Sequence, residues 1–192
     1  MEKNAIILLK KRARRDWMNV RVGTIKDIEG LARVHYESWI TTYTGIFSGE
    51  ILRNRTVEKV ENNWRPRLEN KADKYECFLV ETEKGEIVAF AECGMERSNK
   101  FQIDGELYTL YILESYQRQG LGTLLLKKVI EHLLSHNFNS LLAWVIKDND
   151  SRNFYERHGG KVIGEQWIGD TGILEVAYAW KSLKEFTRGV NG

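Results

Sequence analysis

Two glycines separated by one residue stand where an apolar run gives way to a helical pattern. The apolar run ends at Leu113, Gly120 and Gly122 follow in a polar stretch, and residues 125–134 then repeat apolar side chains at helical spacing. The first turn of a helix has unpaired backbone N–H groups and a partial positive charge. Because glycine has no Cβ, a bulky anion can approach such a turn closely. The pattern indicates a phosphate or pyrophosphate site, with an ordinary glycine turn as the alternative.

Two common phosphate-binding loops do not fit this stretch. A dinucleotide-binding GxGxxG would need glycine where the chain has Leu125, and a P-loop would need GxxxxGK[ST]. What does match is QRQGLG at 117–122, a QxxGxG sequence between an apolar strand and a long amphipathic helix, with NDSRNFYERHGG at 149–160. With these features, residues 20–182 resemble the GNAT superfamily of N-acetyltransferases.

The resemblance implies a site for acetyl-CoA as a co-substrate, without a metal ion. The family's pyrophosphate-binding backbone amides correspond to Gln117, Arg118, Gln119, Gly120, Leu121, Gly122 and Thr123. The end of the preceding strand, implied to pair its backbone with pantetheine as with an added strand, corresponds to Leu110, Tyr111 and Ile112. A backbone N–H at this strand end would also face the thioester carbonyl, where negative charge develops during attack.

The resemblance also extends to the later segment. NDSRNFY is similar to an NxxAxxFY-like helix of the family, which implies Tyr155 near the cofactor sulfur as the general acid and Asn149 against pantetheine. A core aromatic is the alternative for Tyr155. Some members place the asparagine one residue earlier, where this chain has Asp148. The family's usual glycine-phenylalanine is replaced by Gly159-Gly160, which leaves the local packing open.

An acceptor amine needs a base, because an alkyl ammonium group with a pKa of about 10.4 must lose a proton before it attacks. Glu106 lies on the same strand as Leu110, and strand alternation would place it on one face with Tyr108. Members of the superfamily that use a glutamate base have it at this offset from the strand end. A solvent-facing carboxylate is the alternative, and Glu92 and Asp104 are lesser candidates.

Aromatic residues of the N-terminal helical regions correspond to part of the family's acceptor pocket. They are Trp39, Tyr43 and Trp64, whose faces would hold a cationic amine unless they are core residues, as we expect for at least one of them. By pattern, the histidines lie mostly on helix surfaces, and we expect Cys77 and Cys93 to be buried strand residues. Neither cysteine has CxxC spacing, so a reducing, cytoplasmic location is expected.

The elements that must position these residues follow from periodicity and turn signals. The order is a strand at 20–25, a helix at 27–43, a helical region at 48–70 that Pro66 ends or kinks, a hairpin at 77–93, the strand and helix around the glycines, a strand at 140–146, a short helix at 149–159 and two final strands. This order predicts a single-domain α/β fold. The resemblance implies a mixed, mostly antiparallel sheet with helices on both faces and a splayed central parallel strand pair.

Charge divides the chain into a basic N-terminal extension at 1–17 and a domain at 18–192. The extension holds six Lys and Arg against two acids, so the rest of the +2 chain is near −2 and is not a basic nucleic-acid surface. No apolar run approaches the roughly 20 residues that span a bilayer. We therefore expect no membrane partner, and a nucleic-acid partner is disfavoured.

The favoured function is transfer of an acetyl group from acetyl-CoA to a small-molecule amine by direct attack in a ternary complex. Acetylation of a protein N-terminus, of lysine or of aminoacyl-tRNA is an open alternative, and the basic extension would matter most for tRNA. A CoA-binding module without catalysis is another. The family often forms dimers, so a homodimer is compatible with the resemblance.

Overall fold

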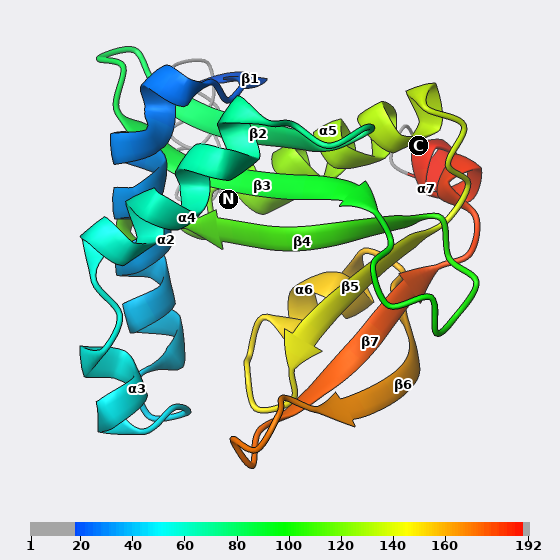
Figure 1. The fold of residues 1–192 in the computed structure, drawn as a ribbon. Helices are drawn as coiled ribbons and strands as arrows, with labels where there is room; N and C mark the ends of the chain where they lie inside the picture. The colour runs from blue at the N-terminus through cyan, green and yellow to red at the C-terminus, as the bar shows by residue number, and fades with distance from the viewer. Residues whose placement is uncertain (1–17, 190–192) are drawn as a thin grey trace, which may run out of the picture.

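Seven strands form one mixed sheet in the computed structural model, which describes residues 18–189 (Figure 1). The strands, in the chain's numbering, are β1 (Met18–Val22), β2 (Glu76–Thr82), β3 (Ile87–Met95), β4 (Gly105–Ile112), β5 (Leu141–Ile146), β6 (Lys161–Trp167) and β7 (Leu174–Trp180). Their order across the sheet is β1-β2-β3-β4-β5-β7-β6. The basic segment 1–17 lies outside the described residues, so the predicted division at 17/18 stays a prediction.

Helices lie on both faces of this sheet, as expected. They are α2 (Ile28–Tyr43), α3 (Gly49–Arg53), α4 (Val57–Glu69), α5 (Leu121–Ser135), α6 (Arg152–Arg157) and α7 (Leu183–Gly189), with short 3-10 helices η1 (Ile25–Asp27) and η2 (Glu114–Tyr116). In Figure 1, α2 and α4 lie in front of the strands and α5 lies behind them. Helix α7, which packs on α5, had no counterpart among the predicted elements.

Strands β4 and β5 are the only parallel neighbours among the described strands, and they share a short ladder. It consists of three residue pairs, Gly105 with Leu141, Glu106 with Leu142 and Leu107 with Ala143. Beyond these pairs the two strands diverge, as Figure 1 shows. The second half of β4 therefore pairs only with β3, and its other edge has no strand beside it. This arrangement confirms the predicted α/β fold with a splayed parallel pair.

Helix α2 begins directly after Asp27, as the sequence predicts, but the Asp27 side chain bonds residues before the helix and does not cap it. The Asp27 carboxylate accepts hydrogen bonds from the Thr24 backbone N–H and hydroxyl, both at 2.8 Å, and from the Arg21 guanidinium at 2.7 Å. The bond from Arg21 is the main cause that lowers the Asp27 pKa to about 2, so this carboxylate stays charged and ties β1 to the start of α2.

The helical region predicted at 48–70 is two helices, and Pro66 lies inside the second without ending it. Each helix begins at a hydroxyl cap: Ser48 Oγ accepts from the Ile51 N–H, and Thr56 Oγ1 accepts from the Lys59 N–H. Helix α4 continues past Pro66 because the Asn70 N–H donates to the Pro66 carbonyl and the flanking turns bury Trp64 and Leu68. Packing offsets the proline's lost hydrogen bond here.

Gly159 and Gly160 close α6 against an indole ring. Gly159 has φ +84°, and a Cβ on Gly160 would lie 2.9 Å from Trp180 Cζ2 and 3.0 Å from the Tyr155 carbonyl oxygen. Trp180 is held there because its Nε1 donates to the His158 carbonyl at 2.7 Å. The side chain of Trp180 thus fills the space beside the second glycine, which answers the packing question that the Gly-Gly pair raised.

We expect Gly160→Ala to destabilise the fold by about 1–3 kcal/mol, because the new methyl group meets a ring and a backbone oxygen that are both held in place. Urea unfolding would show this as a lower midpoint at an unchanged slope. Gly49→Ala is the matched control: its Cβ would meet only the flexible end of Arg53, so a shift within about 0.5 kcal/mol is expected. Equal midpoints for the two variants would contradict tight packing at Gly160.

Candidate active site

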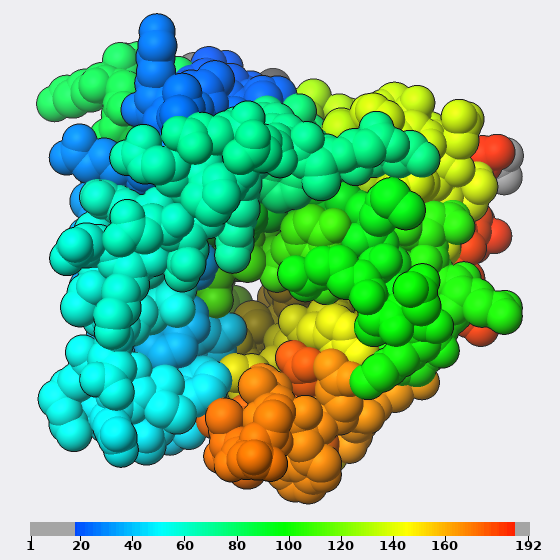
Figure 2. Space-filling view, viewed as in Figure 1, coloured from blue at the N-terminus to red at the C-terminus, as the bar shows by residue number. Residues whose placement is uncertain are grey.

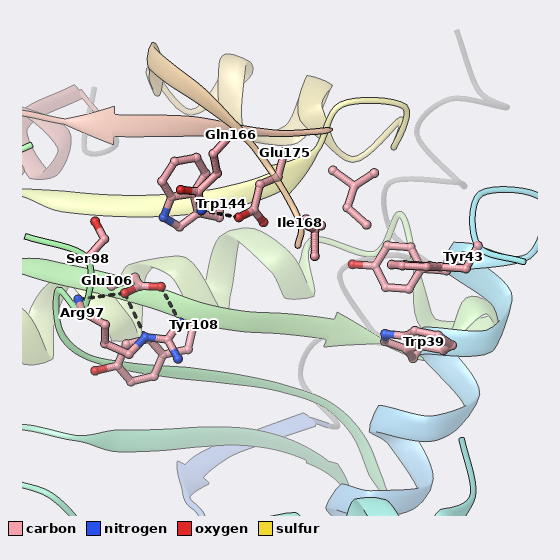
Figure 3. A pocket seen from close by; sticks show the side chains of 12 residues that line it. Trp39, Tyr43, Arg97, Ser98, Glu106, Tyr108, Trp144, Gln166, Ile168 and Glu175 are labelled. Carbon is pink, nitrogen blue, oxygen red and sulfur yellow. Dashed lines mark hydrogen bonds and ion pairs between the residues drawn. The ribbon is translucent and has the colours of Figure 1, made fainter. Parts of the chain in front are cut away.

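A cavity of about 550 Å³ lies between the N-terminal helices and the diverging strands. Figure 2 shows the molecule hollowed between the cyan helices, the green central strands and the orange β6–β7 hairpin. The side chains that line it come from α2 and the turn after it, the loop between β3 and β4, strands β4 to β7 and the turn between β6 and β7: Trp39, Tyr43, Phe47, Arg97, Ser98, Glu106, Tyr108, Trp144, Ile146, Gln166, Ile168 and Glu175. Figure 3 shows these side chains converging from separate parts of the sequence.

Glu106 is buried at the wall of this cavity, with 3% of its surface exposed. The solvent-facing alternative for this residue is therefore wrong. Its carboxylate accepts hydrogen bonds from the backbone N–H of Arg97 at 3.1 Å and from Arg97 Nε at 3.0 Å, and a second guanidinium nitrogen bonds the other oxygen (Figure 3). A buried carboxylate needs such a partner, because its desolvation is costly. These hydrogen bonds are the main cause that raises the Arg97 pKa.

Strand β4 has a bulge at Tyr108. Glu92 of β3 pairs with Thr109, whereas the next residue, Cys93, pairs with Leu107. Tyr108 is thus an extra residue on β4, and the regular alternation expected from Glu106 to Leu110 is interrupted. Both Glu106 and Tyr108 nevertheless line the cavity.

The two lesser candidates for a base have structural partners and do not line the cavity. Glu92 is fully buried and accepts hydrogen bonds from Arg67 and from the hydroxyls of Tyr75 and Thr109. Asp104 accepts from the backbone N–H of Asn139 at 2.7 Å and from the Ser140 hydroxyl at 3.1 Å, which fastens the start of β5. Their carboxylates therefore stabilise local structure.

The three predicted aromatic residues separate into two groups. Trp39 and Tyr43 line the cavity, and Figure 3 shows them on α2 at the end away from Glu106. Trp64 is 1% exposed and packs edge-on against Phe90 in the core. Cys77 and Cys93 are buried free thiols, as expected.

The glycine loop leads directly into the first turn of α5, and its role in binding an anion stays a prediction. Gly120 has φ +87° and precedes the first turn of α5, in which the first internal backbone bond runs from the Leu124 N–H to the Gly120 carbonyl. The N–H groups of residues 121–123 thus have no acceptor within the helix. The loop is folded back on the end of β4, because Gln117 Nε2 donates to the Ile112 carbonyl at 3.2 Å.

The absence of a side chain at Gly122 allows α6 to pack closely against this loop. A Cβ on Gly122 would lie 3.0 Å from the Phe154 ring and 3.6 Å from Ile112 Cδ1. One turn further along α6, His158 Nδ1 bonds the Phe154 carbonyl at 2.8 Å and its Nε2 bonds the Thr123 hydroxyl at 2.9 Å. Two contacts therefore fix the helix that carries Tyr155 relative to the glycine loop.

Tyr155 is buried, and its ring stacks on Tyr178 with centroids 5.8 Å apart. No hydrogen bond joins its hydroxyl to another residue within 18–189. Burial, with a smaller contribution from Tyr43, raises the pKa of the Tyr155 hydroxyl. The phenol therefore keeps its proton at neutral pH, as a general acid requires. A purely structural aromatic would have the same burial, so the acid role stays a prediction.

Asn149 lies before α6, where its Oδ1 accepts from the Ser151 N–H at 2.8 Å. Asp148, the other position considered for this role, is exposed. The side-chain amide nitrogen of Asn149 has no hydrogen-bond acceptor among the described residues, so it is available as a donor toward a ligand. Its assignment to pantetheine stays a prediction.

His35 was expected on a helix surface, and that expectation is wrong. Its Nε2 bonds Arg55 at 2.8 Å and its ring stacks on Tyr111 at 5.0 Å. Burial, aided by nearby Arg55 and Arg67, lowers the His35 pKa to about 3, so the ring is neutral. The periodicity of α2 allows this inward position, but it does not show how α4 and β4 cover that face.

Several cavity residues had no signal in the sequence. Arg97 stands in a polar loop, whereas Trp144 and Glu175 stand in strands that could have been read as ordinary sheet residues. What brings them together is the order of β4, β5 and β7 in the sheet. Within 18–189 there is no cluster of three His, Cys, Asp or Glu residues arranged for a metal ion, and no described helix is long and apolar enough to cross a membrane.

The described residues fit acetyl-CoA at two places. The edge of β4 from Tyr108 to Ile112 has no strand beside it, so a pantetheine arm can pair with its backbone. The first turn of α5 offers free N–H groups behind a left-handed glycine, which suits a pyrophosphate. Leu110, Tyr111 and Ile112 on the strand and Gln117 to Thr123 in the loop would hold the group there.

Comparison with known proteins defines the class. The sequence model of the acetyltransferase (GNAT) family matches residues 36–160, more than half of the chain. The chain therefore belongs to this family, and its enzyme class is that of the acetyl-CoA-dependent N-acetyltransferases.

Particular relatives agree with this class. The "uncharacterized N-acetyltransferase YuaI" of Bacillus subtilis is 36% identical over 168 residues, which are 86% of this chain and 94% of the relative. The PaiA N-acetyltransferase of Thermoplasma acidophilum, crystallised with coenzyme A, has a TM-score of 0.66 at 21% identity and covers 84% of this chain and 97% of its own. The protein yncA of Salmonella typhimurium, solved with its cofactor acetyl-CoA, has a TM-score of 0.63 at 18% identity and covers 88% and 95%. At these identities the two structures show the fold.

Proposed function

We propose that this protein transfers the acetyl group of acetyl-CoA to a small-molecule primary amine, by direct attack in a ternary complex. The observation that carries the proposal is the buried carboxylate of Glu106 in the cavity wall, on the strand whose free edge fits pantetheine. Acetyl-CoA supplies a thioester that is open to attack by an amine. The residues of the chain supply position, proton transfer and exclusion of water.

Glu106 is the proposed base, and Tyr155 is the proposed acid. Glu106 takes one proton from the acceptor's ammonium group, which leaves a neutral, nucleophilic amine. Tyr155 supplies a proton to the departing sulfur and regains one from the acetylated nitrogen. The raised pKa of Tyr155 supports this role because the hydroxyl is protonated when it is needed. Asn149 is proposed to hold pantetheine through its free amide nitrogen.

A small acceptor is supported by the size and lining of the cavity. Its volume of about 550 Å³ falls in the range of small-molecule sites, and five aromatic rings with two carboxylates surround it. The cytoplasmic location belongs to this proposal and is supported by two buried, unpaired thiols. A homodimer stays a prediction.

Thiol release from acetyl-CoA, measured with a panel of alkylamines, amino sugars and peptides, tests the proposal. We expect CoA release only with certain small amines. Calorimetry should show that acetyl-CoA binds both with and without an amine. A peptide or lysine side chain as the best acceptor would contradict the small-molecule assignment. Tight acetyl-CoA binding without turnover on any amine would instead favour a binding module.

A further inference from the structure

Arg97 is the only cation that lines the cavity in the described part of the chain. Among the described residues, every hydrogen bond to the Glu106 carboxylate comes from this one residue, through its backbone N–H and its guanidinium. The proposed base therefore holds a positive group of the protein itself. While the guanidinium is in place, both carboxylate oxygens are engaged.

An aromatic ring forms the second side of the guanidinium site. The Arg97 guanidinium carbon lies 4.1 Å from the ring centroid of Tyr108. The ring does not depend on Arg97 for its position, because the Tyr108 hydroxyl donates to the Met95 carbonyl at 2.7 Å and the ring stacks with Tyr75. A fixed carboxylate beside a fixed aromatic face is a binding site for a cation.

The Arg97 side chain can leave this site without disturbing its surroundings. It is 63% exposed, whereas the Glu106 side chain is 4% exposed. Other residues anchor the loop: the Glu96 carboxylate accepts from the N–H groups of Ser98 and Asn99, and the Phe101 ring packs against Trp144. When the guanidinium swings into solvent, the Arg97 backbone N–H still donates to Glu106 and keeps the carboxylate in position.

The group that replaces the guanidinium must carry a positive charge. A buried carboxylate left without a cation is strongly unfavourable, so a neutral molecule gains little by displacing Arg97. We propose that the Arg97 guanidinium occupies the position at which the acceptor's ammonium group binds, and that acceptors are amines that are cations at neutral pH. This inference rests on the proposed function of Glu106 and makes Arg97 a specificity-determining residue.

The proposal predicts a clear order among acceptors. Alkylamines with a pKa of about 10.4 are cations at neutral pH and compete with Arg97. Aromatic amines are uncharged there and leave Arg97 on Glu106. Arg97 also weakens the binding of every cation, because only the fraction of molecules with the side chain swung out can bind one.

Calorimetry with n-propylguanidinium chloride, an analogue of the arginine head group, tests this on the full-length protein without turnover. We expect Arg97→Ala to bind this probe about tenfold more tightly than wild type, because the competing side chain is gone. Lys128→Ala is the control: it removes one positive charge on α5, where Lys128 pairs with Glu131 outside the cavity. It should bind the probe like wild type. Adding Glu106→Gln to Arg97→Ala should abolish the gain.

Equal binding by wild type and Arg97→Ala, or a gain that survives Glu106→Gln, would overturn the inference. If Arg97→Ala does not fold, as judged by circular dichroism, Arg97→Lys serves in its place. Lysine keeps the positive charge but cannot make the bidentate guanidinium contact. We therefore still expect this variant to bind the probe more tightly than wild type does. Unchanged binding of the probe would count against the inference.

A kinetic arm separates this inference from the proposed function. In Arg97→Ala the KM for a cationic amine should fall about tenfold while the KM for acetyl-CoA stays unchanged. If the wild-type enzyme turns over and the amine KM of Arg97→Ala equals that of wild type, the inference is rejected and the proposed function is retained. Absence of turnover in wild type would reject the proposed function, and the calorimetry would still decide whether Glu106 and Tyr108 form a cation site.

Discussion

Tyr155→Phe should lower kcat by about 10²–10³-fold, within the usual range for loss of a general acid. The change removes one oxygen from a buried ring that has no hydrogen bond to the described residues. The ring still stacks on Tyr178, so the fold and acetyl-CoA binding should be retained. Steady-state kinetics with the best amine of the panel, together with acetyl-CoA calorimetry, would measure both effects.

Tyr178→Phe is the matched control for that experiment. Tyr178 is the stacked neighbour, but its hydroxyl donates to Glu156 at 2.6 Å and accepts from Arg152 at 2.9 Å. We expect its loss to lower stability by about 1 kcal/mol and to leave kcat nearly unchanged. If Tyr155→Phe behaves like Tyr178→Phe, Tyr155 is a core aromatic and another group protonates the sulfur.

Glu106→Gln should lower the rate at neutral pH by about 10²–10⁴-fold, because no carboxylate remains to take the proton of the ammonium group. The amide keeps the shape of the side chain, so acetyl-CoA binding on the far part of β4 should be retained. The distinguishing measurement is the pH profile. In the variant only the free amine reacts, so the rate should rise about tenfold per pH unit from 7 to 9, below the amine's pKa of about 10.4.

Glu106→Asp tests whether the rate depends on the charge of the carboxylate alone or also on the length of the side chain. It keeps the carboxylate but shortens the side chain by one methylene group, so an intermediate rate and a profile like that of wild type are expected. A Glu106→Gln variant with wild-type rate and wild-type pH dependence would show that an ordered water without this carboxylate acts as the base.

The parts of the fold that depend on local pattern could be predicted from the sequence. Hydrophobic periodicity predicts the hairpin of β2 and β3 and the helix α2. Glycines at the turn predict the change from β4 to α5. The sequence of residues 117–122 also indicated the family, which the family model confirms.

The rest depends on contacts between distant segments. Periodicity could place His35 on α2 but could not show that Arg55 and Tyr111 would enclose it. The expectation that a helix ends near a proline failed at Pro66, because the burial of Trp64 and Leu68 stabilises the helix on both sides of it. The pairing of Arg97 with Glu106 depends on how one loop folds over one strand end, and no local pattern in the sequence specifies that geometry.

The short ladder between β4 and β5 lies between two groups of strands in the sheet. Strands β1 to β4 are bound together by α5 on one face and by α2 and α4 on the other. Strands β5, β7 and β6 form a second group, which has a backbone ladder of three residue pairs with β4 and further contacts where α6 and α7 pack against α5 and the loop before it. A ligand bound between the diverging ends of β4 and β5 would contact both groups, so it would act as a cross-link as well as a reactant and stabilise their relative position.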